Sequence, residues 1–180
     1  SGVAEEDLPN YSVAGCQEPL IMGKDNANTT NSWLNMAKIL ELTLTGGKSA
    51  ITGAAIGPQT NHDAKYILEN LRPLFYENLQ HFCEQMRDAA NGASRALSLL
   101  PVPFLSCFEG GLESGYDARD TVDQGTPYNG SGCLIHGLSV VADSFIAVDH
   151  LLKDRPEDAE KLIAACKCNF EGYEELRDYL

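Results

Sequence analysis

The stretch from Asp63 to Leu99 constrains the fold most, because apolar side chains recur along it at helical spacing. The positions that share one helical face are Ile67, Leu68, Leu71, Leu74, Phe75, Leu79, Phe82, Cys83 and Met86. Pro73 predicts a kink early in this helix, and Gly92 predicts a break near its end. The longest helical region of the chain is therefore expected here.

Shorter segments show the same period. A helix is predicted to begin at Ser32, a candidate N-cap, and to end at Gly46-Gly47. Its apolar positions are Trp33, Met36, Ala37, Leu40 and Leu44. Further helices are predicted over Val140–Leu151, Asp158–Cys168 and Tyr173–Leu180, and Val3–Pro9 resembles the end of one.

Three short segments favour strands: Tyr11–Ala14, Pro101–Ser106 and Cys133–Gly137. The Asn- and Thr-rich stretch from Ile21 to Asn31 predicts an irregular loop, because such side chains bond their own backbone. Strands that alternate with helices predict an α/β fold with mostly parallel strands. Two to four strands are too few for a self-contained parallel barrel of roughly eight.

Composition narrows the classes of function. The 180 residues are 43% apolar, which is enough for the core of one domain. A net charge of −13 repels phosphate backbones and anionic lipids, so nucleic acid and membrane partners are not expected. No run of about 18 apolar residues and no signal-peptide pattern occurs, and we expect a cytoplasmic protein.

The six cysteines lack the dense spacing of a secreted disulfide scaffold. We interpret them as reduced thiols, mostly small buried apolar side chains. Cys166 and Cys168 form a C-x-C pair without a second pair or nearby histidines, which is poor spacing for zinc. The histidines, at positions 62, 81, 136 and 150, share no ligand spacing, so no metal is predicted.

The segment Gly15-Cys16-Gln17-Glu18-Pro19 puts a thiol and a carboxylate two residues apart on a tight turn after a strand. Both groups can converge on one ligand there. By residue chemistry alone an incidental loop cysteine is the more common interpretation. A hydrolase dyad of Cys16 with His136 and a non-catalytic scaffold stay open as alternatives.

Several motifs in order along the chain resemble one enzyme family. They are the residues from Tyr11 to Pro19, the helix with Leu34-Asn35-Met36 that follows, Pro103–Ser106, Tyr128–Gly132, Val141–Val148 and Asn169–Arg177. Together they resemble the active-site cysteine loop and the surrounding barrel of the glycyl radical enzymes, the pyruvate formate-lyase-like superfamily. The resemblance implies that this α/β chain is part of their (β/α) barrel.

The position after the cysteine separates subtypes of that family. Pyruvate formate-lyase proper has two adjacent cysteines, whereas this chain has Gln17 after Cys16. The C-x-E pattern resembles dehydratases of glycerol, propanediol and hydroxyproline, together with choline trimethylamine-lyase, isethionate sulfite-lyase and hydroxyphenylacetate decarboxylase. A carbon–heteroatom lyase that eliminates water is expected. A formate C-acetyltransferase-like or decarboxylase member of the family is the alternative.

The resemblance also implies roles for residues. Cys16 would form the thiyl radical that takes a hydrogen atom from a hydroxylated substrate, and Glu18 would act as general base. Thr29, Trp33 and Asn28 are expected to bind substrate, with Asn26 and Thr30 as weaker candidates. Tyr128 and Asn129 are expected to pack the barrel instead.

The family's R-V-x-G-Y type motif, which carries the radical glycine, does not occur in these residues. The resemblance therefore implies that residues 1–180 are one partial barrel domain without the glycyl radical C-terminal domain, inactive alone. No bound metal or organic cofactor is expected. The implied partners are an S-adenosylmethionine-dependent iron–sulfur activating enzyme and a second copy of the parent in a homodimer. The leaving group stays open.

Overall fold

A computed structural model describes residues 2–15, 18–25, 31–123, 125–128 and 132–180. The chain divides into two compact units, each built from two stretches of sequence. We call residues 1–33 and 86–134 the hairpin unit, and residues 34–85 and 135–180 the helical unit. The expectation of one partial barrel domain stays a prediction.

The hairpin unit begins with a 3₁₀ helix, η1 (Glu5–Asn10), and two three-residue strands, β1 (Tyr11–Val13) and β2 (Pro19–Ile21). The strands pair antiparallel, with Tyr11 opposite Ile21 and Val13 opposite Pro19. Two short helices, α4 (Pro103–Ser106) and α5 (Gly111–Ser114), follow the part of α3 (Leu71–Leu97) that belongs to this unit. The predicted strand at residues 11–14 is confirmed.

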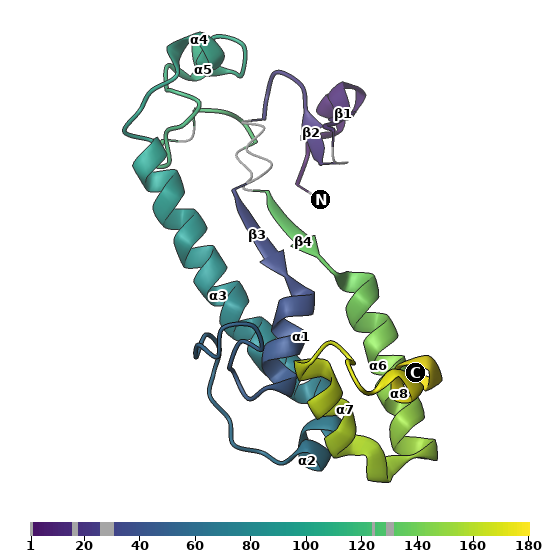
Figure 1. The fold of residues 1–180 in the computed structure, drawn as a ribbon. Coiled ribbons are helices and arrows are strands. Elements are labelled where there is room, and N and C mark those ends of the chain that lie inside the picture. The colour runs from purple at the N-terminus through teal and green to yellow at the C-terminus, as the bar shows by residue number, and fades with distance from the viewer. Residues whose placement is uncertain (1, 16–17, 26–30, 124, 129–131) are drawn as a thin grey trace. The chain divides into compact units, whose positions relative to one another are not determined.

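A second pair of strands consists of β3 (Ser32–Asn35) and β4 (Cys133–His136), which are neighbours although a hundred residues separate them. Their arrows run in the same direction (Figure 1). The amide of Asn31 donates to the carbonyl of Gly132 at 2.9 Å just before both strands begin. The predicted strand at residues 133–137 is confirmed.

The helical unit contains most of the apolar core. Its elements are α1 (Met36–Leu44), α2 (Ala64–Glu69), the first part of α3, α6 (Leu138–Asp154), η2 (Pro156–Asp158), α7 (Ala159–Lys167) and α8 (Glu174–Tyr179). Helix α1 packs on α6, and α2 packs on α7. Leu42, Phe75 and Leu151 are each no more than 1% exposed. Helical periodicity predicted α6, α7 and α8 correctly.

The predicted helix from Ser32 is wrong in its first turn, because Ser32–Asn35 is strand β3. The N-cap of α1 is Asn35, whose side-chain oxygen accepts the Lys38 amide at 3.0 Å. Hydrogen bonding to β4 gives residues 32–35 a backbone partner outside a helix, which delays the start of α1. The predicted stop at Gly46-Gly47 holds, since α1 ends at Leu44.

The long helical region is interrupted at Asn70, three residues before Pro73. Proline lacks an N–H, so it is tolerated in the first turn of a helix, where that donor has no partner. Pro73 therefore lies near the beginning of α3 instead of kinking a continuous helix. Gly92 does not break α3, which continues to Leu97.

The predicted strand at Pro101–Ser106 is also wrong, because α4 occupies Pro103–Ser106. Neither proline can donate to a strand ladder, whereas Pro103 suits the first helical position. The amide of Ser106 donates to the Val102 carbonyl at 2.9 Å. The expectation of mostly parallel strands needs a second correction, since the β1–β2 pair is antiparallel.

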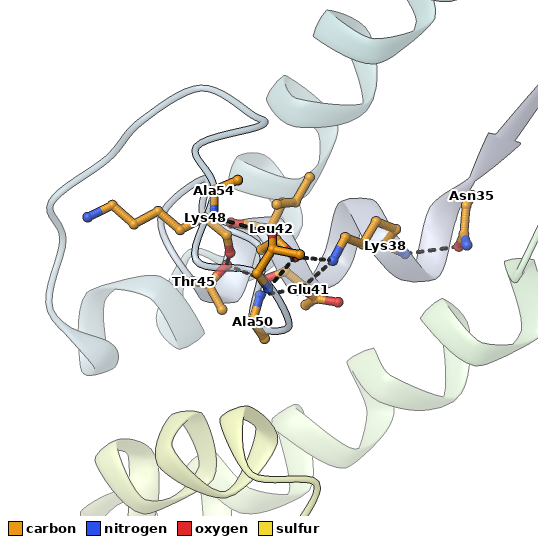
Figure 2. Close-up of polar contacts among 10 residues, drawn as sticks. Asn35, Lys38, Glu41, Leu42, Thr45, Lys48, Ala50 and Ala54 are labelled. Carbon is orange, nitrogen blue, oxygen red and sulfur yellow. Dashed lines mark hydrogen bonds and ion pairs between the residues drawn. The ribbon is translucent and has the colours of Figure 1, made fainter.

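A polar cluster joins the end of α1 to the loop that follows it (Figure 2). Glu41 accepts hydrogen bonds from Lys38 Nζ at 2.6 Å and from the Ala50 amide at 2.7 Å. The loop passes through Gly47 at φ +87°, where an added Cβ would lie 2.2 Å from the Pro58 carbonyl. Only glycine fits at this position, because both the conformation and the space exclude a side chain.

Five cysteines lie in the described residues, all as free thiols, and none of them is buried: Cys83, Cys107, Cys133, Cys166 and Cys168. The expectation of mostly buried side chains is therefore wrong for these five. Burial raises the pKa of the half-buried Cys166 thiol. Within the described residues, no helix is long and apolar enough to cross a membrane.

Candidate active-site hairpin

In sequence, the C-x-E segment connects strand β1 to strand β2. The amide of Ala14, directly after β1, donates to the carbonyl of Glu18 at 2.9 Å, directly before β2. Positions 15–17 connect these two residues, so the sequence places Cys16 in this loop. Cys16 and Gln17 themselves lie outside the described residues.

Glu18 is half-buried at the beginning of β2. Its position is fixed by the neighbouring strand, because the next residue, Pro19, pairs with Val13. A carboxylate held at the edge of a short hairpin can act on a ligand near the same loop. The catalytic roles predicted for Cys16 and Glu18 stay predictions.

The predicted substrate-binding residues are covered only in part. Asn26, Asn28, Thr29 and Thr30 lie outside the described residues. Trp33 lies on β3 and is 65% exposed. Trp33 comes shortly after the predicted pocket loop in sequence, and its binding role stays a prediction.

Three side chains meet at the open end of the hairpin, opposite the C-x-E loop. Asp7, in η1, is only 5% exposed and accepts a hydrogen bond from Lys24 Nζ at 2.6 Å. Tyr128 Oη donates to the other Asp7 oxygen at 2.7 Å and accepts from the Ala4 amide at 2.9 Å. The Tyr128 amide also donates to the Lys24 carbonyl at 2.8 Å. We call Asp7, Lys24 and Tyr128 the hairpin clamp.

The hairpin clamp shifts the pKa of each member. Hydrogen bonds from Lys24 and then from Tyr128 lower the pKa of Asp7. The same contacts to Asp7 raise the pKa of Lys24 and of Tyr128. Each shift favours the state with a charged carboxylate, a charged amine and a protonated phenol, so the clamp is stable near neutral pH.

Sequence reasoning did not find the hairpin clamp. Asp7 ends an acidic run and Lys24 sits in a polar segment, so neither stands out in its surroundings. Tyr128 was assigned only to packing, yet its hydroxyl bonds a carboxylate 121 residues away. The one sequence signal for the hairpin clamp was the ordered set of family motifs, because that set includes both Tyr128 and the hairpin segment.

The described residues contain no group of three or more His, Cys, Asp and Glu side chains that could hold a metal ion. Carboxylates of the hairpin unit such as Asp7 and Asp117 are already bonded to other groups of the protein. Asp117, for example, accepts from Ser106 Oγ at 2.9 Å and from the Val102 amide at 2.7 Å.

Comparisons with known proteins give one consistent result. The family described as "Pyruvate formate lyase-like" matches residues 1–180. The chain is 28% identical over 179 residues to (2S)-3-sulfopropanediol dehydratase of Klebsiella oxytoca, covering 97% of this chain and 21% of that protein. The chain thus spans about a fifth of the length of such relatives.

Solved structures agree with the sequence comparison. Hydroxyproline dehydratase from Clostridioides difficile, with substrate trans-4-hydroxy-L-proline bound, is 28% identical with a TM-score of 0.85. The glycerol-bound B12-independent glycerol dehydratase from Clostridium butyricum is 26% identical with a TM-score of 0.82. Each match covers 97% of this chain and 22% of the other. The predicted α/β class is confirmed.

Proposed function

Because this chain belongs to the pyruvate formate lyase-like family of glycyl radical enzymes and has the fold of part of their (β/α) barrel, we propose that it carries the active-site hairpin of a radical lyase of the dehydratase type. The observation that carries the proposal is the C-x-E segment in the loop between β1 and β2. Relatives named as dehydratases and as isethionate sulfite-lyases support a lyase. Gln17, in place of a second cysteine, disfavours acyl transfer.

The thiol and the carboxylate fit this radical chemistry because they are two positions apart on a loop that a short hairpin presents. The family's radical on a backbone glycine, outside these residues, supplies a one-electron oxidation of the Cys16 thiol. We infer that an iron–sulfur activating enzyme using S-adenosylmethionine installs it, in an anaerobic cytoplasm, and that the whole enzyme is a homodimer. No metal or organic cofactor is proposed for this chain.

In the proposed cycle, the Cys16 thiyl takes a hydrogen atom from a substrate carbon that bears a hydroxyl group, giving the thiol and a carbon radical. Glu18 accepts the hydroxyl proton, which helps the group on the adjacent carbon to leave. Where that group is hydroxide, it takes up the proton and departs as water. The Cys16 thiol then returns a hydrogen atom to the product radical, and the thiyl is restored.

We propose further that residues after the hairpin bind the hydroxylated substrate. Thr29 and Asn28 offer hydrogen-bonding groups to a hydroxyl, and Trp33 offers an aromatic face that excludes water. Exclusion of water strengthens the action of Glu18 and shields a carbon radical from side reactions. The leaving group, whether hydroxyl, ammonium or sulfonate, is the property that product analysis would identify.

The test uses the complete enzyme, activated without oxygen and assayed on a panel of diols and hydroxylated substrates. Cys16→Ser should retain the glycyl signal in electron paramagnetic resonance but lose turnover at least about a thousandfold. Glu18→Gln should lower kcat about a hundredfold or more, because a positioned general base contributes 10²–10⁴. Cys107→Ser, at an exposed cysteine of the hairpin unit, is the matched control. Turnover unaffected by Cys16→Ser would refute the proposal.

A further inference from the structure

We propose that Asp7, Lys24 and Tyr128 are positioning residues for the lyase reaction, holding the open end of the hairpin so that its loop presents Cys16 and Glu18 to substrate. This inference rests on the proposed function. None of the three side chains is proposed to touch substrate. Their contacts hold the open end of the hairpin. They affect the reaction only indirectly, because the two strands connect that end to the loop.

The hairpin requires such support because it is short. Each strand has three residues, and an isolated two-stranded hairpin is at best marginally stable in water. Strand β1 also exposes two large apolar side chains, since Tyr11 is 54% and Val13 is 50% exposed. Of the three residues in β2, only Ile21 is buried. Apolar burial along the strands therefore fixes their position weakly.

The hairpin clamp supplies contacts on both sides of the strand pair. Asp7 precedes β1 and Lys24 follows β2, so their 2.6 Å ion pair joins the chain that enters the hairpin to the chain that leaves it. The Met22 amide donates to the Asn10 carbonyl at 3.0 Å between them. The buried Asp7 carboxylate accepts hydrogen bonds from Lys24 and Tyr128. Such charge-assisted bonds are short and directional, so they give the open end of the hairpin a defined geometry.

Tyr128 ties the open end of the hairpin to a distant segment of the same unit. Its hydroxyl contacts Asp7 and the Ala4 amide, while its backbone donates to the Lys24 carbonyl and forms a parallel bridge with Asp25. One residue therefore holds both the entering and the leaving chain. Loss of the hydroxyl alone would release the entering chain from Tyr128, while Asp7 keeps its ion pair with Lys24.

Hydrogen transfer depends steeply on the distance between the reacting atoms, and a displacement of 1 Å can cost about a hundredfold in rate. A loop at the end of a six-residue hairpin amplifies any rotation at its base. Weakening the hairpin clamp should therefore slow hydrogen abstraction without changing the groups that contact substrate.

The experiment uses the complete, activated enzyme and Tyr128→Phe, with Tyr116→Phe as the control. Tyr116 lies in the same unit and is 47% exposed. Tyr128→Phe should lower kcat about tenfold, with KM within about twofold and the glycyl radical yield unchanged. The deuterium isotope effect on kcat should rise, because abstraction becomes slower relative to the other steps. If Tyr128 served only in folding, the isotope effect would stay unchanged.

Hydrogen exchange provides a second measurement on the same proteins. The amides of Ala14 and Met22 should exchange about tenfold faster in Tyr128→Phe, while α1 in the helical unit is unchanged. Lys24→Met should reproduce both effects, and Lys24→Arg should restore part of kcat because it keeps the cation. Tyr116→Phe should match the unsubstituted enzyme in each readout.

The outcomes separate this inference from the proposed function. If turnover requires Cys16 but Tyr128→Phe keeps kcat, isotope effect and exchange within about twofold, the positioning role is refuted and the lyase stands. A loss of kcat that only parallels a loss of radical yield also refutes it. If the unsubstituted enzyme forms no radical, or turns over without Cys16, the proposed function fails and the positioning role fails with it.

Discussion

The two units of this chain keep their shape by different physical means. In the helical unit, apolar side chains from six helices are buried among the described residues. Phe75 is 1% exposed, and its ring lies 5.4 Å from that of Phe145. The hairpin unit contributes only three of the buried apolar residues among those described: Ile21, Ala90 and Ala118. Burial thus dominates one unit, and the other depends on directional polar contacts.

Polar clusters organise the hairpin unit. Ser106, which is 6% exposed, donates to Asp117 and accepts from the Ala118 amide at 2.8 Å. Partial burial alone would raise the pKa of Asp117, but hydrogen bonds from Arg119, Ser106 and Val102 lower it instead. Large apolar side chains of this unit stay outside, such as Phe104 at 81% exposed.

This difference between the two units predicts how far the effect of a substitution spreads. Apolar burial is non-directional and its loss is felt throughout a packed unit, whereas a polar cluster fixes the geometry of a few residues. The radical chemistry proposed for Cys16 is carried by the polar unit. Precise placement of a loop is better served by directional contacts than by a core that can repack.

The largest effect is expected for Phe75→Ala in the helical unit. The cavity should cost about 3–5 kcal/mol of unfolding free energy, because the ring is 1% exposed and packs edge-on against Phe145 of α6. Hydrogen exchange of the complete protein would measure it, with the exposed neighbour Tyr76→Ala as control at less than about 1 kcal/mol. If both variants lost the same unfolding free energy, the view that apolar burial dominates the stability of the helical unit would be wrong.

A smaller and more local effect is expected for Ser106→Ala in the hairpin unit. It leaves the buried Ala118 amide without its partner, which costs about 1–3 kcal/mol. Exchange should quicken around residues 102–118 and stay unchanged in α6. Ser98→Ala, at a serine that bonds only a nearby helical carbonyl, should cost a few tenths of a kcal/mol. Spread of the effect into α6 would contradict the local character of the cluster.

The smallest effect is expected from a change in pH, which should weaken the hairpin clamp only in strongly acidic or strongly alkaline solution. The lowered pKa of Asp7 means that its contribution is present above its ordinary value of 3.8 and is lost as pH falls further. Lys24 and Tyr128 have raised pKa values, so their contributions are present below 10.5 and 10.0 and are lost as pH rises beyond them. Glu6 is the other charge near Lys24.

Protection of the Ala14 and Met22 amides, corrected for intrinsic exchange, should therefore be flat between about pH 5 and 9 and fall on both sides. In Tyr128→Phe the alkaline fall that reflects the phenol should disappear. A profile that changes between pH 6 and 8 would contradict the assignment of these groups to the clamp.

Local patterns predicted most elements of the helical unit, whereas in the hairpin unit they predicted β1 and missed β2, α4 and α5. Apolar residues at helical spacing gave α6 and α7 within a few residues, and the run Tyr11–Ala14 gave β1. The errors fell where two local interpretations compete. Trp33 fits a helical stripe as well as a strand. Pro103 lies within a β-prone run, yet it also suits the first position of a helix.

The sequence by itself determined the family, through ordered motifs, and the proximity of Cys16 to Glu18, because two residues on one loop are held together by the chain itself. Tertiary structure decided the partner of β3 and the contacts of Tyr128 with Ala4 and Asp7. Hydrogen bonds between residues more than a hundred positions apart leave no periodicity in the sequence. Their partners are fixed only when folding brings distant segments to within about 3 Å.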